Sequence, residues 1–336
     1  MKILLASYLY YYGDKAAGYA PEYHDIGGAL ADMGHTVLHV AYDKPAFKER
    51  VFENAARSFQ PDLVLYNPAS GNEMNWQLFA QMPFKKALLY SDDTWRREQG
   101  LQWSQFADYV LTTTTDGATV YGDKHVPFQW GVRVSRWAGL KPVERDVNVM
   151  FLGMNHSTRA QMAEKLVSAG LVPALYGRGW PRPFNGDKMP DLLATARIGI
   201  NTTTDSTGQG RQFKARLFEV AASGAMLLTE YVDGLDQYFT HGSDAVFFTT
   251  FDDMVDKALH YLSNPREREA IAARGRQRAL TQHDYRLRFT PLIERVTNDP
   301  TLCDRTHALL ELRIDHRPRH AIGALAIRRN RAAFHV

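Results

Sequence analysis

Short apolar runs of β-strand length alternate with helical patterns along most of this chain, and this alternation narrows the folds open to it. The runs are rich in Val, Ile and Leu, which is typical of strands buried on both faces of a parallel sheet. Parallel strands need long crossover connections, and the helical segments between the runs can supply them. The sequence therefore predicts an α/β fold made of doubly wound, Rossmann-like sheets.

The alternation occurs twice, with a break at the charged, proline-containing segment GLKPVERD at 139–146. In the first half we expect strands at 2–7, 36–42, 63–67, 86–91 and 109–114, and helices at 21–33, 45–58 and 73–81. In the second half we expect strands at 147–153, 172–177, 197–202, 225–230 and 245–250, and helices at 157–169, 188–195, 212–223, 252–263 and 265–280.

A chain of 336 residues is long enough for about two domains. We expect an N-terminal domain at 1–140, a C-terminal domain at 146–285, and a final helix with a basic tail at 286–336. Two doubly wound domains would face each other across a cleft. Ligands of such sheets bind beyond the carboxyl ends of the strands, so we expect the ligand-binding residues in the segments that follow each strand.

The net charge of +3 is unevenly distributed along the chain. Residues 305–336 hold seven arginines against Glu311 and Asp315, a local charge of +5, so the remaining residues sum to −2. A basic tail can attract nucleic acid, although a solvated tail is the commoner case. The tail therefore permits a DNA partner, but the slightly acidic body does not favour one.

The cysteine content and the N-terminus bear on the compartment. Cys303 is the single cysteine, which excludes an internal disulfide framework and a cysteine-built metal site and fits a reducing compartment. The start, MKILLASYLYYYGDK, is short and rich in tyrosine, and we interpret it as a buried strand rather than a signal peptide. No run approaches the roughly 18 apolar residues of a membrane span. We expect a cytoplasmic protein.

The strands of the second half are followed by segments suited to an anionic ligand. Gly153, Asn155 and Arg159 lie where a strand gives way to a helix, and a helix start offers free backbone N–H groups to an anion. The next strand is followed by Gly177, Arg178 and Trp180, where the indole could stack on a flat ring or pack on a neighbouring helix. Asn201 and Thr202 end the third strand, and a polar, hydroxyl-rich loop follows them.

That loop leads into GRQFKARLFEVAASGAMLLTE at 210–230, which places Arg211, Lys214 and Arg216 before an apolar helix that carries Glu219. Solvent contacts of a helix start are one interpretation of these cations. Binding of a charged ligand is the other.

Several motifs in this order resemble the nucleotide-sugar-binding half of GT-B-fold glycosyltransferases. They are VNVMFLG…R, LYGRGW, LLATARIGINTTT, FKARLFEVAASGAMLLTE, YLSNPREREAIAARGRQRAL and HDYRLR. The most similar branch is the spore-maturation (CgeB-like) or group 1-like family. In the first half, ALLYSDDTWR and FADYVLTTT are also similar, and the resemblance covers about residues 1–290.

The resemblance implies a hexosyltransferase that uses a nucleoside-diphosphate sugar, most commonly a UDP-sugar, and needs neither a cofactor nor a metal. It implies that Glu219 holds the ribose hydroxyls and that Arg211, Lys214 and Arg159 neutralise the diphosphate. Arg216 could instead pair with Glu219 or another acid. Retaining members often carry a second glutamate eight positions before the ribose glutamate, and Arg211 occupies that position here. The stereochemical outcome therefore stays open.

The acceptor side is expected in the first domain. Asp92 and Asp93 end its fourth strand, and we expect one to be the general base and the other to cap the helix that begins near Trp95. His24 is a second candidate base, although a lone histidine is more often structural.

The tyrosine-rich first loop supplies Tyr11, Tyr12 and Tyr19 as candidate acceptor-binding rings. A small molecule or glycan is the favoured acceptor. The alternatives are a glycosyltransferase that acts on hydroxylated bases of modified DNA and a non-catalytic protein that binds nucleotide sugars.

Overall fold

The computed structural model describes residues 1–41, 49–68, 76–300 and 324–327. Its contacts divide the chain into two compact units, which are described separately. The first unit comprises Met1–Thr112, Asp116–Phe128 and Phe289–Val336, and the second comprises Thr113–Thr115 and Gln129–Arg288. Residues 129–140 thus belong to the second unit, and the segment after 288 belongs to the first, unlike the boundaries expected from the sequence.

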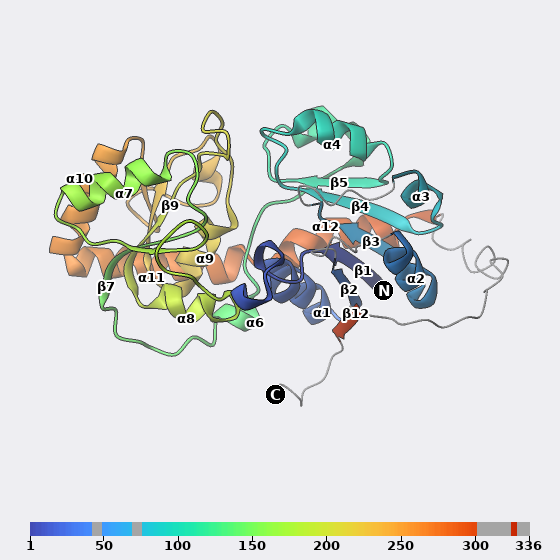
Figure 1. Cartoon of the computed structure of the whole chain (residues 1–336), viewed down its shortest axis with the longest axis horizontal. Coiled ribbons are helices and arrows are strands. Elements are labelled where there is room, and N and C mark those ends of the chain that lie inside the picture. The colour runs from blue at the N-terminus through green and yellow to red at the C-terminus, as the bar shows by residue number, and fades with distance from the viewer. Residues whose placement is uncertain (42–48, 69–75, 301–323, 328–336) are drawn as a thin grey trace. The chain divides into compact units, whose positions relative to one another are not determined.

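The first unit is built on a sheet in the order β12-β2-β1-β3-β4-β5-β6 (Figure 1). Its strands are β1 (Lys2–Ser7), β2 (Thr36–Ala41), β3 (Leu63–Tyr66), β4 (Lys85–Tyr90), β5 (Tyr109–Thr112), β6 (His125–Pro127) and β12 (Ala324–Ile327). The strands β1 to β6 are parallel, with Ile3 in register with Val37 and Leu63, and β12 pairs with β2 in the antiparallel direction.

The helices of the first unit follow the expected crossover pattern. They are a wide π-helical turn (Glu22–Gly27) that continues into α1 (Gly28–Asp32), then α2 (Glu49–Phe59), α3 (Trp76–Gln81), α4 (Arg97–Ser104), α5 (Gly117–Tyr121) and α12 (Tyr285–Thr297). The first four residues of α12 belong to the second unit.

The strands of the first unit are largely buried, and five of the six residues of β1 are buried. This near-continuous burial explains why the strands read as unbroken apolar runs.

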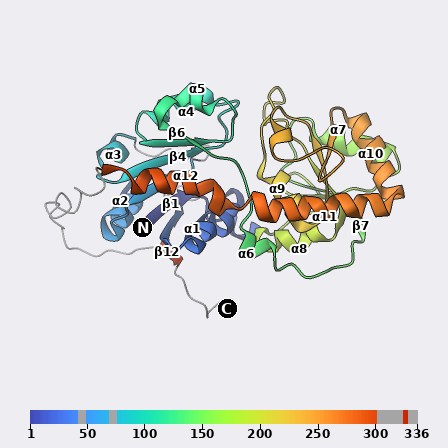
Figure 2. The same cartoon turned by 180° about the vertical axis from the view of Figure 1, so that it is seen from behind.

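The second unit holds a parallel sheet in the order β11-β10-β9-β7-β8. Its strands are β7 (Val147–Leu152), β8 (Ala174–Tyr176), β9 (Ala196–Asn201), β10 (Met226–Glu230) and β11 (Val246–Phe248). Its helices are α6 (Val134–Trp137), α7 (Arg159–Ser168), α8 (Met189–Ala194), α9 (Ala215–Ser223), α10 (Phe251–Ser263) and α11 (Pro265–Gln282). Figure 2 shows α11, the longest of these helices, alongside α9.

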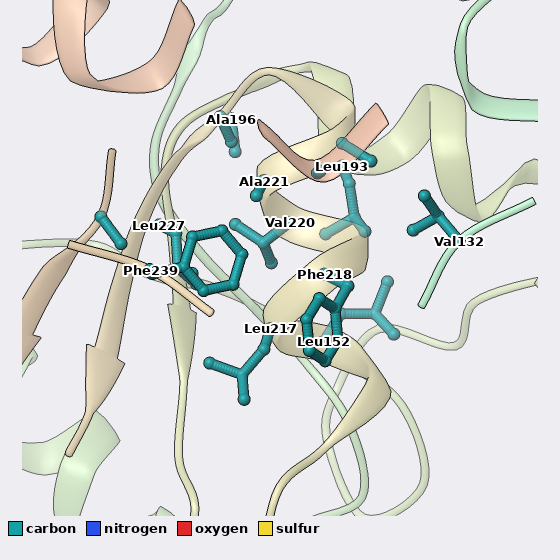
Figure 3. Close-up of a cluster of buried hydrophobic side chains, with 14 of the residues drawn as sticks. Val132, Leu152, Leu193, Ala196, Leu217, Phe218, Val220, Ala221, Leu227 and Phe239 are labelled. Carbon is teal, nitrogen blue, oxygen red and sulfur yellow. The ribbon is translucent and has the colours of Figure 1, made fainter. Parts of the chain in front are cut away.

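Alternate residues of β7 enter two different hydrophobic layers, as a strand with both faces covered requires. Met150 and Leu152 belong to the layer built with α8 and α9, whereas Val149 and Phe151 belong to the layer built with α7 and α10. Figure 3 shows how Leu217, Phe218, Val220 and Ala221 of α9 lie among the buried side chains of the first layer.

Gly199 lets α9 approach β9 closely. A Cβ on this residue would lie only 2.5 Å from Cγ1 of Val220. Such a close approach of helix and sheet requires the absence of a side chain. The position of α9 matters because the helix carries the candidate site residues Arg216 and Glu219, and Lys214 is its N-cap residue.

The predicted alternation is confirmed, and each expected strand overlaps an observed one. The strands β6 and β12 and the helices α5 and α6 were missed, because each is no longer than five residues. The expected helices at 45–58 and 73–81 and the strand at 36–42 extend into 42–48 and 69–75, which lie outside the described residues. Cys303 and all seven tail arginines also lie outside them.

Candidate functional site

The two loops that carry most of the predicted donor residues follow the neighbouring strands β7 and β9 (Figure 1). In the sheet, β8 lies on one side of β7. The strands β9, β10 and β11 lie on its other side. The connections that follow β7 and β9 therefore diverge at the carboxyl ends of these strands, which is where doubly wound sheets bind ligands.

Arg159 joins these two loops. Its Nε donates to Oγ1 of Thr202 at 3.0 Å, and its Nη1 donates to the carbonyl of Met154 at 2.7 Å. The side chain is only 8% exposed, and its guanidinium lies 5.1 Å from the ring centre of Phe151. Arg159 thus places a fixed positive charge between the ends of β7 and β9.

Asn201 and Thr202 are buried and bonded to other parts of the protein. Asn201 Nδ2 donates to Oγ1 of Thr229 at 3.0 Å, and Thr202 accepts the bond from Arg159. Their exposed fractions are 2% and 0%. These two residues are therefore suited to holding the ends of neighbouring strands in place.

The loop after β8 packs directly on the loop after β7. A Cβ on Gly177 would lie 2.4 Å from the carbonyl oxygen of Gly153, and Asn155 Nδ2 donates to the carbonyl of Gly179 at 3.3 Å. Arg178 is exposed, while Trp180 is half-buried and meets Phe151 edge-on at 6.2 Å. The indole therefore packs on a side chain of the strand β7, whereas the sequence suggested packing on a neighbouring helix or stacking on a flat ring.

Glu230, at the end of β10, organises the loop after β9. Its Oε2 accepts bonds from the backbone N–H groups of Thr203 at 2.8 Å and Thr204 at 3.0 Å, and both hydroxyls also donate to it. Arg211 completes the set, with Nη2 3.3 Å from Oε1 and Nη1 donating to the carbonyl of Tyr231. Sequence reasoning missed Glu230, although an acid at the end of the apolar run AMLLTE was a signal.

The start of α9 differs from the sequence prediction. The expected helix begins at 212, but Arg211 pairs with Thr204 in an isolated antiparallel bridge and Gln212 donates its N–H to Thr203. These bonds hold the segment extended, so α9 begins at Ala215 with Lys214 as its N-cap residue. No side chain caps this helix start.

Arg216 and Glu219 form a buried ion pair, which confirms one of the alternatives for Arg216. Its Nη1 lies 2.7 Å from Oε2 of Glu219, and its Nε donates to the carbonyl of Leu152 at 3.0 Å. Glu219 is 3% exposed. The pair thus ties the first two turns of α9 to the carboxyl end of β7.

The pKa of His156, a residue that was not predicted as part of the site, is sensitive to the charges of this region. Burial, followed by the positive charges of Arg159 and Lys214, lowers the pKa of His156 to about 4, while Asp205 acts in the opposite direction. The two cations come from the two different loops. The loops after β7 and β9 therefore share one positive field that disfavours a further cation.

A pocket of about 300 Å³ lies beside these loops. Its polar lining includes Thr158, Thr204, Arg211, Glu230 and Thr249. Thr158 follows β7, Thr204 and Arg211 follow β9, Glu230 ends β10 and Thr249 follows β11. The pocket therefore lies at the carboxyl ends of these strands. The site combines hydroxyl groups, fixed cations and the starts of α7 and α9, a set that suits a polar, anionic ligand.

In the first unit, Asp93 is completely buried and both of its oxygens are engaged. The hydroxyl of Tyr121 donates to Oδ1, and Arg97 Nη2 donates to Oδ2 at 3.1 Å. Burial and this carboxylate raise the pKa of Tyr121. Arg97 also bonds to Asp116 at 2.6 and 2.9 Å, so Asp93 belongs to a structural network.

The expectation that Asp92 or Asp93 caps the next helix is wrong. That helix, α4, begins at Arg97, and its N-cap residue Arg96 makes no side-chain cap. The backbone carbonyl of Asp92 accepts from Trp95 and Arg96 in a turn. The Asp92 side chain is half-buried, and its carboxylate makes no hydrogen bond to the part of the chain that the structure describes.

The loop after β1 gathers the other acceptor-side candidates. Tyr19 stacks on Tyr10 at 5.2 Å and on Tyr23 at 4.4 Å, and His24 meets Tyr19 edge-on at 5.6 Å. The ring centres of Tyr11 and Tyr12 lie 5.8 Å apart. Tyr12 is 46% exposed, the largest exposed fraction among the candidate rings, whereas Tyr19 and His24 are part of an aromatic stack.

Within the described ranges, no group of three or more His, Cys, Asp and Glu side chains could hold a metal ion. None of the helices in these ranges has the length and apolar character needed to cross a membrane.

Residues 158–294 match the family described as Glycosyl transferase-like. One curated relative, the ribosomal RNA large subunit methyltransferase K/L of Marinobacter nauticus, is 31% identical over 97 residues. This match covers 29% of the chain, and the chain spans only 13% of that protein's length.

Solved structures match most of the chain. Sucrose-phosphate synthase from Thermosynechococcus elongatus aligns with a TM-score of 0.65 at 14% identity over 88% of this chain and 99% of that chain. AviGT4, a glycosyltransferase involved in avilamycin A biosynthesis, aligns at 0.63 and 15% identity over 90% and 98%. Anabaena HepE in complex with UDP-glucose aligns at 0.59 and 12% identity over 88% and 99%. At these identities the likeness shows the fold: the chain has the GT-B fold found in glycosyltransferases.

Proposed function

We propose that this protein is a hexosyltransferase that moves a sugar from a UDP-sugar to a hydroxyl group of an acceptor. The observation that carries the proposal is the position of the buried Arg159, which bonds to Met154 and Thr202 between the carboxyl ends of β7 and β9. Lys214 acts with it on the nearby His156. Both cations lie inside the segment that matches the glycosyl transferase-like family. The complex of Anabaena HepE with UDP-glucose supports the choice of donor.

In this proposal the diphosphate lies at the starts of α7 and α9. Arg159, Lys214 and Arg211 supply positive charge, and the uncapped helix starts supply backbone N–H groups. Fixed charges of this kind stabilise a leaving group on which negative charge develops, without reorganising during the reaction. Glu219 is assigned to the ribose hydroxyls, and Arg178 to the nucleotide at the rim of the site.

The glycosyl transfer itself needs a group that accepts the acceptor's proton. We assign this role to Asp92, because the oxygens of its neighbour Asp93 are already occupied by Tyr121 and Arg97. The acceptor oxygen bonds to C1 of the sugar, the bond between C1 and the diphosphate oxygen breaks, and the proton passes to Asp92. The nucleotide leaves as UDP.

The acceptor is proposed to be a small molecule or a glycan. The rings of Tyr11 and Tyr12 could stack on a sugar face, and Tyr19, which stacks on Tyr10 and Tyr23, is the third candidate ring. A DNA acceptor would need basic side chains along an extended surface. The uneven charge of the chain, with a slightly acidic body, supports the smaller acceptor.

Within the GT-B enzymes we assign the chain to the spore-maturation (CgeB-like) branch. The blocks LYGRGW and FKARLFEVAASGAMLLTE support this choice. The single cysteine in 336 residues supports activity in a reducing compartment, and we place the enzyme in the cytoplasm.

Turnover of a panel of nucleotide sugars by the full chain, with hydrolysis scored alongside transfer, tests the proposed function. We expect release of UDP from one or more UDP-sugars, and we expect it to persist in EDTA because cations and helix starts replace a divalent ion. Activity that EDTA abolished and Mg²⁺ or Mn²⁺ restored would disprove metal independence. Nucleotide binding with no turnover on any donor would instead favour the non-catalytic alternative.

Lys214→Ala is expected to weaken UDP binding by about 1.5–3 kcal/mol, the range for hydrogen bonds to charged groups. Calorimetry with UDP measures the change directly. Lys165→Ala is the matched control, because Lys165 lies in the last turn of α7 and pairs with Asp252. Equal affinities of the two variants would contradict the placement of the diphosphate.

Arg211→Ala should weaken UDP binding less than Lys214→Ala does, because the carboxylate of Glu230 already offsets much of the charge of Arg211.

UDP-glucose affinity is expected to rise as the pH falls from neutral toward 5. The free protein holds the pKa of His156 at about 4. A bound diphosphate would stabilise the imidazolium and raise that pKa, so protonation and binding would favour each other below the raised value. UDP-glucose is the suitable probe because its diphosphate has no secondary proton to lose in this range. The pH dependence should disappear in His156→Gln, and a profile that is the same in both proteins would refute the assignment.

A further inference from the structure

A second pocket, of about 560 Å³, lies in the second unit where β7 and β9 begin, at the edge of the sheet opposite the donor site. Five cations and one acid contribute to its lining: Lys141, Arg145, Arg197, Arg268, Arg276 and Glu269. They come from the segment between α6 and β7, from the start of β9 and from α11. We call it the basic pocket.

The positive charge of the basic pocket exceeds the negative charge that its described lining supplies. Glu269 is shared, because Arg145 pairs with its Oε2 and Arg268 lies 3.1 Å from its Oε1. Arg197 donates to the neutral side chain of Asn148. One carboxylate thus serves two arginines, and the other cations of the lining add to the excess.

Arg276 has a clear structural role among the cations of the lining. Its guanidinium donates to the carbonyls of Ala222 at 2.5 Å and Trp137 at 3.2 Å, at the last turns of α9 and α6. Even so, burial and then the positive charge of Arg145 lower the pKa of Arg276. The charge of Arg145 therefore adds to the cost of keeping Arg276 charged and buried, and a bound anion would offset that cost.

We propose that the basic pocket binds a compact polyanion that carries two or more phosphate groups. Adjacent phosphates could bond to Arg145, Arg197 and Lys141 together, and guanidinium groups bind phosphate oxygens in a bidentate manner. A concave site of this volume suits a small molecule, whereas nucleic acid requires an extended basic surface. The ligand is either an inorganic polyphosphate or a phosphorylated small molecule. This inference does not depend on the proposed glycosyltransferase activity.

Calorimetry of the full chain with inorganic tripolyphosphate and with a sugar bisphosphate tests the proposal, and variants of the lining arginines distinguish the basic pocket from the donor site. We expect binding of one or both probes at one site, weakened by added salt. Arg145→Gln and Arg197→Gln should each raise the Kd by about tenfold, as expected for losing a charge-assisted bond. Arg266→Gln is the matched control, because Arg266 is exposed on the same helix α11 and does not line the pocket.

The probe that binds more tightly identifies the source of the phosphates. Circular dichroism checks that each variant is folded, and Lys141→Gln, at an exposed position, provides a further variant that should also weaken binding. Absence of binding by both probes would overturn the proposal. So would Kd values of Arg145→Gln and Arg197→Gln equal to that of the control Arg266→Gln. The proposal would also be overturned if neither small probe bound and the protein instead bound duplex DNA, with an affinity that Arg197→Gln lowered.

Discussion

Asp92→Asn is expected to lower kcat by about 10²–10⁴-fold, the usual contribution of a general base, while UDP affinity stays unchanged. An amide cannot accept the acceptor's proton, yet it has nearly the same size as the carboxylate. The half-buried Asp92 side chain makes no bond to the described part of the chain that the change would break. Steady-state kinetics with the best donor from the nucleotide-sugar panel, together with calorimetry for UDP, measures both quantities.

Asp93→Asn is the matched control at the adjacent residue. Its carboxylate accepts from Tyr121 and Arg97 in a fully buried position, so the amide should lower the free energy of unfolding by about 1.5–3 kcal/mol. The folded fraction of this variant should keep most of its turnover. If both variants retained full kcat, Asp92 would not be the base, and His24 would become the next residue to test.

The architecture was predictable because it depends on local patterns. In β7 every residue from Val149 to Leu152 is buried, and its side chains enter two layers by turns, so the strand reads as a continuous apolar run. Runs of this kind separated by amphipathic helices leave few alternatives to parallel, doubly wound sheets. Short elements such as β6, which has three residues and ends at Pro127, carry no comparable signal.

The site was predictable as a region, but the partners of its side chains were not. The strand-end rule brings the loops after β7 and β9 together without any knowledge of contacts. In contrast, the pairing of Arg211 with Glu230 joins residues 19 positions apart, and the bond between Tyr121 and Asp93 joins residues 28 apart. No periodicity encodes such pairs, so the sequence alone could not separate Asp92 from Asp93 or identify Glu230 and His156.

Glu219→Gln is expected to lower the free energy of unfolding by about 3 kcal/mol. The change leaves Arg216 buried beside a neutral amide, and breaking a buried ion pair is costly because one charge stays uncompensated. Glu53→Gln is the matched control. Nη2 of Arg57 lies 2.7 Å from Oε1 of Glu53, the same distance as in the buried pair, but these two residues lie on the exposed surface of α2. That pair should contribute less than about 1 kcal/mol. Urea denaturation of the three proteins measures the difference.

Stability alone would not separate a ribose-binding glutamate from one that only holds Arg216, so the decisive readout is ligand discrimination. If Glu219 accepts bonds from the ribose hydroxyls, the unsubstituted protein should bind UDP more tightly than its 2′-deoxy analogue, because a carboxylate bonded to a hydroxyl is worth about 1.5–3 kcal/mol. Glu219→Gln should lose most of that preference, whereas Glu53→Gln should keep it. A variant that was destabilised but still preferred UDP to the same degree would show that Glu219 is a structural partner of Arg216, and the ribose would then have to be held by other groups at the carboxyl ends of β7 and β9.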